Sequence, residues 1–407
     1  MGFRSRNHIN RTDKVKIIMK YITILAMALL AMPVSAQSSA NALAKAQECI
    51  KAVKAKVAPD SRQAIYDIKA YNNNDGSLVV GGEVSDSTAM KETVKALAEA
   101  GVEYADSMHL LPYDQWAQIR ISAASLRTGG RHSAEMATQA VLGTPVRVLE
   151  KGGEWWRVQT PDGYIAWVPS SSVVAKTSAE MKKWREAKRF IVSAPYQIRV
   201  YTTPTTKGLR DVVTDLVNGC IVEVPGNEVH VTDGRVNVAL PDGRTGFVDV
   251  SDLTPIETWA SQNFDADRIL DIAYSMEGTP YLWGGTSTKA LDCSGLAKVS
   301  YYANGLILMR DASQQALTGK RIEAANWRSC KAGDLLFFGN ARTGKVTHVA
   351  IYDHDGNYVH SSGRVKRNSV DPESESYLTT PFLHAVRIAG SEETPGITRA
   401  RNHPWYF

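Results

Sequence analysis

Tyr281-Leu282-Trp283-Gly284-Gly285 and, shortly after it, Asp292-Cys293-Ser294-Gly295-Leu296 form the stretch that decides the fold of the C-terminal third of this chain. A single cysteine follows a glycine-rich loop and begins an apolar run. Because the apolar residues of that run recur with helical spacing, the sequence predicts that Cys293 lies in the first turn of a buried helix. The helix dipole and the free amide groups there favour a negative sulfur, so we expect a lowered thiol pKa. The alternative is a small buried cysteine with a structural role.

Two predicted strands downstream each carry a histidine. Residues 345–352 contain His348, residues 357–362 contain His360, and Asp355-Gly356 between them is a typical hairpin turn. Adjacent strands of a hairpin lie side by side, so we expect the two histidines to come close together. A nucleophile at a helix start, a base on a strand and an orienting group on the next strand fit the general logic of a catalytic triad.

With these motifs the C-terminal part, about residues 264–388, resembles the NlpC family of papain-like cysteine peptidases, which cut the stem peptides of peptidoglycan. Six pieces match in order: Tyr281-x-Trp-Gly-Gly, Asp292-Cys-Ser-Gly-Leu, Arg310-Asp-Ala-Ser-Gln-Gln, Gly333-Asp-Leu-Leu-Phe-Phe, Thr347-His-Val-Ala-Ile-Tyr and Val359-His-Ser-Ser-Gly. The resemblance implies that Cys293 is the nucleophile, His348 the base and His360 the orienting residue. It also implies that the Tyr281 hydroxyl helps the Cys293 amide to stabilise the oxyanion, and that no metal or cofactor is required.

Composition sets broad limits on the rest of the chain. With 407 residues the protein is too long for a single core, so two to four domains are expected. A hydrophobic content of 43% and a charged content of 22% are ordinary for globular proteins. The net charge of +5 is mild, and no basic run points to nucleic-acid binding.

The N-terminus has the pattern of a secretory signal peptide. Three lysines precede the apolar run Tyr21–Val34, and Val34-Ser35-Ala36 fits a cleavage site before Gln37, with Met19 as the better start. A run of about 14 apolar residues is too short to span a bilayer. No cysteine lies near the cleavage site, so we expect export to the periplasm or the cell exterior without a lipid or membrane anchor.

The four cysteines, Cys49, Cys220, Cys293 and Cys330, lie far apart and lack the paired spacing of a zinc site. In an oxidising compartment a disulfide framework would be denser. We therefore expect Cys49, Cys220 and Cys330 to be small buried residues, although a disulfide of Cys220 or Cys330 stays open.

An internal repeat organises the middle of the chain. Pro161-Asp162-Gly163 and the strand after it recur eighty residues later as Pro241-Asp242-Gly243 and its strand. Each copy follows another short strand, which predicts two small barrels that resemble bacterial SH3-like domains. Before them, the order helix, strand (Gln63–Ile68), strand, helix, strand predicts a small α+β domain that loosely resembles the BON domains of envelope proteins.

The expected fold is therefore a multidomain α+β protein with a papain-like catalytic domain. Its predicted parts are a signal peptide (1–36), the BON-like domain (37–110), the first SH3-like barrel (111–176), a helical linker (177–189), the second SH3-like barrel (190–257), the peptidase domain (258–390) and an irregular tail (391–407).

Two SH3-like domains before such a peptidase resemble the secreted dipeptidyl-peptidases that act on free cell-wall peptides. In that group the first barrel closes the active-site cleft and surrounds the free amine of the substrate. The resemblance implies Glu135, either Tyr164 or Trp167, and Asp292 as contacts of this ammonium, and an ammonium favours carboxylates and aromatic faces. For Glu135 the alternative is an ordinary exposed loop acid.

Further candidates for substrate binding lie in the matched motifs. Trp283 is expected to line the groove rather than the core, and Ser294 follows the nucleophile. Arg310, Asp311 and Ser313 belong to a motif near the cleft, where Arg310 either contacts substrate carboxylates or pairs with Asp311.

Together these features predict a monomeric endopeptidase that cuts the γ-D-glutamyl–diamino acid bond of peptidoglycan peptides with a free N-terminal L-Ala. The alternatives are an amidase or general wall hydrolase of the same fold, and a wall-binding protein with an inert catalytic domain. The sequence leaves open the diamino acid and whether intact wall is a substrate.

Overall fold

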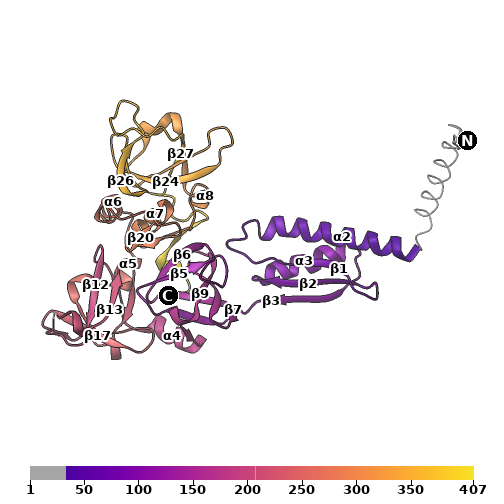
Figure 1. Cartoon of the computed structure of the whole chain (residues 1–407), viewed down its shortest axis with the longest axis horizontal. Helices are drawn as coiled ribbons and strands as arrows, with labels where there is room; N and C mark the ends of the chain where they lie inside the picture. Colours follow the sequence, from indigo (N-terminus) through magenta and orange to yellow (C-terminus); the bar gives the residue numbers. More distant parts are fainter. Residues whose placement is uncertain (1–33, 207) are drawn as a thin grey trace, which may run out of the picture. The chain divides into compact units, whose positions relative to one another are not determined.

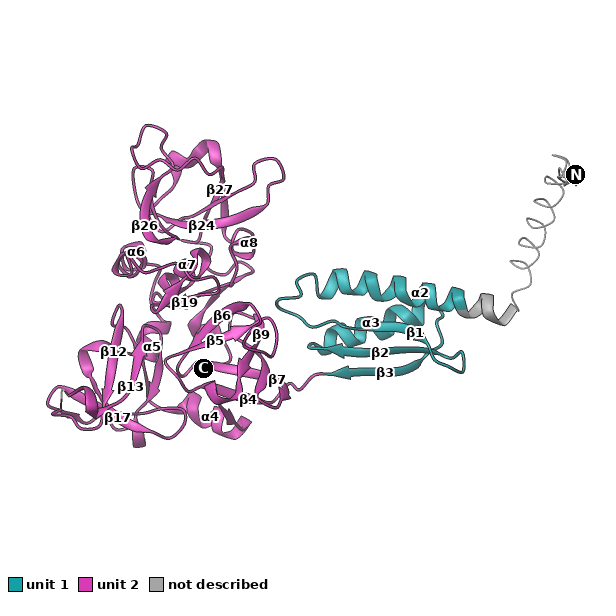
Figure 2. Cartoon of the chain, in the orientation of Figure 1, with its two compact units in different colours: residues 1–110 teal, residues 111–407 magenta. Residues whose placement is uncertain are grey.

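The structure, a computed structural model, describes residues 34–206 and 208–407. Most of the predicted signal peptide lies outside these residues. The chain divides into two compact units, residues 1–110 and 111–407, which Figure 2 colours separately. Within the described residues no helix combines the length and apolar character needed to cross a membrane.

The first unit is a three-stranded sheet covered on one face by two helices. Its elements are α2 (Val34–Val57), β1 (Lys69–Asn72), β2 (Leu78–Val84), α3 (Ser87–Glu99) and β3 (Ala105–Leu110). β2 is central, antiparallel to β1 and parallel to β3. The strand predicted at Gln63–Ile68 is wrong, because only Tyr66 bridges to β2 and regular pairing starts at Lys69. The order of elements follows the prediction, and the BON-like assignment stays a prediction.

The second unit contains two antiparallel sheets in sequence, which we call the first and second modules. The first module has β4 (Trp116–Ile119), β5 (Ala123–Arg127), β6 (Met136–Val141), β7 (Pro145–Gly152), β8 (Trp155–Gln159), β9 (Ile165–Pro169) and β10 (Val173–Lys176), in the order β10-β4-β7-β8-β9-β5-β6. The helix α4 (Ser178–Glu186) follows, with a capping box formed by Thr177 and Glu180.

The second module repeats the design of the first. Its strands are β11 (Arg189–Val192), β12 (Gln197–Tyr201), β13 (Val212–Val217), β14 (Ile221–Glu223), β15 (Val231–Thr232), β16 (Arg235–Ala239), β17 (Thr245–Asp249) and β18 (Leu253–Pro255). Gly163 and Gly243 have φ values of 83° and 87° at equivalent turns, a conformation that favours glycine. In both modules the strand after this turn leads through a short 3-10 helix into the last strand.

The C-terminal domain packs helices against a six-stranded antiparallel sheet. The helices are α6 (Ala266–Ser275), α7 (Cys293–Tyr302) and α8 (Ala312–Gln315), while α5 (Ile256–Ala260) before them packs against β11 and β18 of the second module. The sheet runs β22 (Lys320–Glu323), β27 (Phe382–Arg387), β23 (Leu335–Gly339), β24 (Val346–Tyr352), β25 (Asn357–Ser362) and β26 (Arg364–Ser369). Figure 1 shows α7 beside β24, and residues of both belong to one buried apolar core.

The tail is more ordered than predicted. Residues Ile397–Arg399 form β28, which pairs with β21 (Leu306–Leu308), and a 3-10 turn follows at Ala400–Asn402. Tyr406 is 1% exposed and joins a cluster with Trp184 and Trp259. The terminal aromatic residues supply the apolar surface that holds the segment against the second unit.

Candidate active site

The helix start that presents Cys293 is fixed by its neighbours. Asp292 is the N-cap of α7, and its Oδ1 accepts a hydrogen bond of 2.7 Å from the Gly295 amide. A Cβ added at Gly295 would lie 1.9 Å from the Gly285 carbonyl oxygen, so only glycine lets the glycine-rich loop approach this turn. The Cys293 amide belongs to the first turn, whose N–H groups have no intrahelical acceptor.

The hairpin brings the two histidines together as the sequence predicts. Asp355 and Gly356 have φ values of 49° and 82°, as a tight hairpin turn requires. His348 on β24 and His360 on β25 approach to 2.7 Å between Nε2 and Nδ1. His360 is fully buried, whereas His348 is half-buried.

Asn368 on β26 extends this chain of hydrogen bonds, and sequence reasoning missed it. Its Oδ1 lies 2.9 Å from His360 Nε2, and its Nδ2 donates to the Ser376 carbonyl at 2.8 Å. Because the amide oxygen can only accept, His360 Nε2 carries the proton. His360 Nδ1 then accepts from His348 Nε2–H, which leaves His348 Nδ1 as the basic nitrogen.

The Cys293 thiol lies close to the strand that carries His348. Sulfur of Cys293 is within hydrogen-bonding reach of the backbone amide of Val349, the residue after His348. The residue is 8% exposed, and burial, followed by the charge of Asp292, raises the pKa of the thiol to about 11. The expected lowering of this pKa is therefore wrong, because the cost of desolvating a thiolate exceeds the benefit of the helix start.

Both histidines are neutral at ordinary pH. Burial, and then the neighbouring His360 and Lys366, lower the pKa of His348 to about 3. Burial lowers the pKa of His360 to about 4. The free protein consequently holds a neutral thiol beside a neutral imidazole, rather than a thiolate–imidazolium pair.

Asp292 and Arg310 form a buried pair that sequence analysis assigned differently. Arg310 is 1% exposed, and its Nη2 lies 2.5 Å from Asp292 Oδ2. The same carboxylate accepts from the Gly284 amide at 2.9 Å, while Ser294 Oγ donates to it at 3.2 Å and accepts from Arg310 Nη1 at 2.9 Å. These internal partners orient both side chains, and the roles of Asp292 and Ser294 as substrate contacts stay predictions.

Arg310 does form an ion pair with Asp311, as one alternative predicts, whereas its contact with substrate carboxylates stays a prediction. Its main partner is Asp292, and Asp311 Oδ1 lies farther away at 3.9 Å from Nη1. Asp311 forms a capping box with Gln314 at the start of α8 and keeps 29% of its side chain exposed. Ser313 is exposed on α8.

The first module contacts the glycine-rich loop directly. Gln139 Oε1 accepts from the Thr286 amide and from Ser287 Oγ, both at 3.0 Å, and Thr286 Oγ1 donates to the Gln139 carbonyl at 2.9 Å. A Cβ added at Gly284 would lie 2.5 Å from the Met136 carbonyl oxygen. This close approach places exposed Glu135, one residue before Met136, beside the loop that carries Trp283.

The two aromatic candidates of the first module have different surroundings. Tyr164 is 9% exposed and close enough to Arg310 to contribute to the raised pKa of that guanidinium. The ring of Trp167 is covered by Arg157, whose Cζ lies 5.9 Å from the ring centroid, and packs near Gly130 of its own module. The structure thus favours Tyr164 over Trp167 as the residue that faces the C-terminal domain.

The glycine-rich loop supplies two further candidates, Tyr281 and Trp283. Tyr281 is half-buried, and burial together with the nearby Cys293 and Asp292 raises the pKa of its phenol, which therefore keeps its proton as a donor. Trp283 is 61% exposed, so it is not a core residue, and its place in a substrate groove stays a prediction.

The remaining cysteines are free thiols. Cys220 and Cys330 are buried as expected, but the prediction for Cys49 is wrong, because this residue is only partly buried on α2. Across residues 34–206 and 208–407, no group of His, Cys, Asp and Glu side chains is arranged to hold a metal ion.

Comparison with known proteins agrees with this geometry. Residues 278–387 match the model of the NlpC/P60 family, and residues 126–173 match that of the bacterial dipeptidyl-peptidase Sh3 domain. The crystal structure of an NlpC/P60 family protein from Bacillus cereus superposes with a TM-score of 0.56 at 22% identity, covering 67% of this chain and 99% of that one, which shows a shared fold.

Two curated relatives extend the comparison to sequence. The gamma-D-glutamyl-L-lysine dipeptidyl-peptidase of Bacillus cereus is 28% identical over 263 residues, which is 61% of this chain and 74% of that protein. The probable endopeptidase NlpC of Escherichia coli is 36% identical over 121 residues, which is 29% of this chain and 75% of that protein. The chain therefore belongs to the NlpC/P60 family of cysteine peptidases.

Proposed function

We propose that this protein hydrolyses the γ-D-glutamyl–diamino acid bond of peptidoglycan stem peptides that carry a free N-terminal L-Ala. The observation that carries the proposal is the line Cys293, His348, His360 and Asn368, with the first module seated against the loop beside it. The name of the Bacillus cereus relative, a gamma-D-glutamyl-L-lysine dipeptidyl-peptidase, supports this bond and this class of substrate.

The proposed reaction steps follow from which ring nitrogen of His348 and of His360 carries the proton. As the Cys293 sulfur attacks the γ-carbonyl carbon, its proton passes to His348 Nδ1, and the carbonyl oxygen becomes an oxyanion near the Cys293 amide and the Tyr281 hydroxyl. The imidazolium of His348 then protonates the leaving amine as the C–N bond breaks. Water, deprotonated by His348, attacks the thioester, and the thiol regains its proton when the acid product leaves.

Recognition of the free amine is proposed to come from the first module. The candidate carboxylates are Glu135, which is exposed on the first module, and Asp292, which pairs with Arg310 and adjoins the nucleophile. Glu135 and Tyr164 would surround the ammonium, and a longer, glycan-linked substrate would be blocked there. Such selectivity fits a protein that processes released wall peptides in the periplasm or outside the cell.

Digestion of defined muropeptides tests the proposal. We expect the free peptide L-Ala-γ-D-Glu-diamino acid to yield L-Ala-γ-D-Glu and the diamino acid, as read by mass spectrometry. A product cut between the sugar and L-Ala would instead identify an amidase, and release of material from intact wall would identify a general hydrolase. Absence of cleavage in every arm would support a binding protein.

The pH profile of activity should be broad. His348 must be unprotonated to accept the thiol proton, and burial lowers its pKa to about 3, so kcat/KM should fall only well below pH 6.5. At high pH, kcat/KM should fall only when the Cys293 thiol ionises, and the pKa of this thiol is raised to about 11. Stopped assays with circular dichroism as a control for folding would measure both limbs. An acidic limb near pH 6–7 would show instead that His348 is solvated and titrates normally.

Substitutions of His360 and Asn368, which orient His348, should lower the rate of hydrolysis without abolishing it. His360→Gln keeps an acceptor for His348 Nε2–H, so measurable activity is expected, whereas His348→Gln should be inactive. Asn368→Leu leaves the buried His360 N–H without a partner, at a cost of about 1–3 kcal/mol, or about ten- to hundredfold in kcat. Steady-state kinetics on the three variants measure this order. Equal, complete loss in His360→Gln and His348→Gln would contradict the division of roles.

A further inference from the structure

The repeated Pro-Asp-Gly turn docks each module onto its neighbour. In the second module, Asp242 Oδ2 accepts from Arg120 Nε of the first module at 3.0 Å, and the Pro241 carbonyl accepts from Lys176 Nζ at 2.8 Å. The first module uses the same two acceptors toward the C-terminal domain. Asp162 Oδ2 lies 2.6 Å from Lys298 Nζ, and the Pro161 carbonyl accepts from His403 Nε2 at 2.9 Å.

The two copies differ in burial, although the chemistry is the same. The two acids are both buried, with 1% of the Asp162 and 8% of the Asp242 side chain exposed, but Lys298 is 18% exposed and Arg120 is 41% exposed. The Thr160 hydroxyl also donates to Asp162. A buried ion pair is highly sensitive to loss of one partner, because the other charge is left desolvated, while an exposed pair is worth little.

The place of the buried pair connects it to specificity. Lys298 lies on α7, the helix that begins at Cys293, and Tyr164 follows Asp162 by two residues. Any shift of this turn relative to α7 therefore moves Tyr164 relative to the thiol. The pair fixes the position of one wall of the proposed amine site.

The end of the chain closes over the same turn. His403 is 8% exposed, and its Nδ1 accepts from the Trp405 amide at 3.2 Å while its Nε2 donates to Pro161. Trp405 stacks edge-on against Trp116 of the first module at 5.2 Å between centroids, and Tyr302 on α7 donates to Tyr406 at 3.2 Å. The segment 403–407, which we call the C-terminal clasp, thus contacts both partners of the docking.

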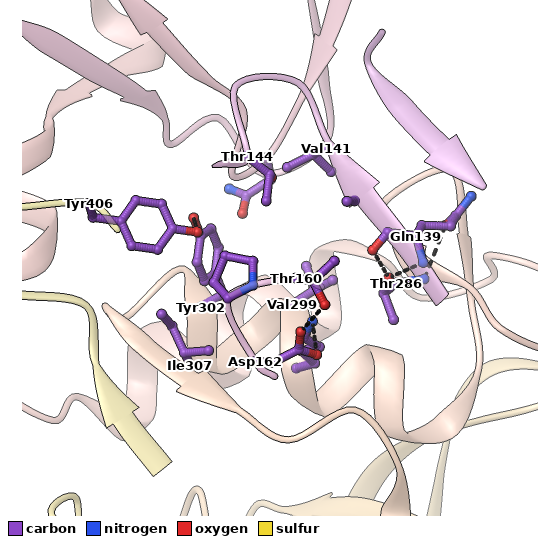
Figure 3. A pocket seen from close by; sticks show the side chains of 14 residues that line it. Gln139, Val141, Thr144, Thr160, Asp162, Thr286, Val299, Tyr302, Ile307 and Tyr406 are labelled. Atoms are coloured by element: carbon purple, nitrogen blue, oxygen red, sulfur yellow. Dashed lines mark hydrogen bonds and ion pairs between the residues drawn. The ribbon is translucent and has the colours of Figure 1, made fainter. Parts of the chain in front are cut away.

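The space left at this junction is small. Figure 3 shows Asp162, Thr160 and Tyr302 around it, with Tyr406 on the far side. The cavity has a volume of about 70 Å³, room for a few waters. It is too small for a peptide or sugar ligand, so the buried charges serve the contact between the parts.

We propose that the Asp162–Lys298 pair, held under the C-terminal clasp, is a specificity-determining docking contact that sets where the first module stands over the nucleophile helix. Loosening it should relax the preference for peptides with a free amine while the thiol chemistry continues. This inference rests on the proposed function, because it assumes that the first module recognises the amine.

A set of matched variants tests the contact. Asp162→Leu and Lys298→Met each leave a buried charge unpaired, and we expect each to lower the ratio of kcat/KM between free and N-acetylated peptide by about tenfold or more. The double variant removes both charges and keeps apolar volume, so it should recover most of the ratio. Asp242→Leu, the same change at the second copy of the turn, which contacts Arg120 of the first module instead of α7, should leave the ratio unchanged and serves as the control.

Hydrogen exchange gives a readout that does not depend on the substrate. The single variants should exchange faster than wild type at residues 137–141 and 284–288, where the first module meets the glycine-rich loop, and the double variant should not. If wild type prefers the free amine and the single variants keep both that preference and wild-type exchange, the docking role is overturned. If wild type shows no preference while the variants alter exchange as expected, the contact stands and the amine site of the proposed function fails.

Discussion

Cys293→Ala is expected to lower kcat/KM by about five to six orders of magnitude, because loss of a triad nucleophile typically removes nearly all chemical catalysis. The neutral thiol of Cys293 is the group proposed to form the acyl-enzyme, and water in its place would lack the sulfur's nucleophilicity. Hydrolysis of the free peptide, followed by mass spectrometry over long incubations, measures the residual rate.

The control for this variant is Cys49→Ala, which removes a partly exposed thiol on the first unit and should leave activity unchanged. Both proteins should keep wild-type circular dichroism, since each change removes only one sulfur atom from a small side chain. If Cys293→Ala retained more than about 1% of wild-type activity, a covalent mechanism through this thiol would be excluded.

Local patterns were enough to predict the principal site residues. The apolar spacing after Cys293 gave the helix, and Asp355-Gly356 gave the turn that places His348 beside His360. Both signals lie within short segments, where periodicity and turn chemistry act directly. The repeated turn was also visible in the sequence, because it recurs with the same three residues.

Contacts between distant segments were not predictable in the same way. Asn368 reaches His360 only because β26 pairs with β25 in a register that sets Asn368 opposite Tyr358. Arg310 reaches Asp292 across eighteen residues that include the whole of α7. The motifs contain both residues without stating which atoms meet, so sequence analysis did not predict the Asp292–Arg310 pair.

Burial also decided the electrostatics of the thiol. A helix start lowers a thiol pKa where water still reaches the sulfur, and Cys293 is 8% exposed. The sequence shows the helix start but not how closely the glycine-rich loop and β24 cover it. The same limit applies to the tail, whose aromatic residues pack on side chains from four different parts of the second unit.

Blocking the substrate's amine is expected to produce the second large effect. If Glu135 and Tyr164 surround an ammonium, acetylation removes the charge, adds bulk and leaves the Glu135 carboxylate, which the bound peptide desolvates, without its partner. Such a loss is worth about 2–5 kcal/mol, or roughly thirty- to several-thousandfold in kcat/KM. Comparing L-Ala-γ-D-Glu-diamino acid with its N-acetyl form on wild type measures the effect.

Glu135→Gln separates the amine contact from general binding. The amide keeps the size of the side chain but not its charge, so the variant should lose activity on the free peptide and change little on the acetylated one. Trp167→Phe is the matched control, because Trp167 packs against Arg157 within its own module and should leave the ratio unchanged. Cleavage of acetylated peptides or intact wall at the rate of free peptides would show that the first module is no gate. The modules would then be interpreted as anchors that hold a general wall hydrolase on its polymer.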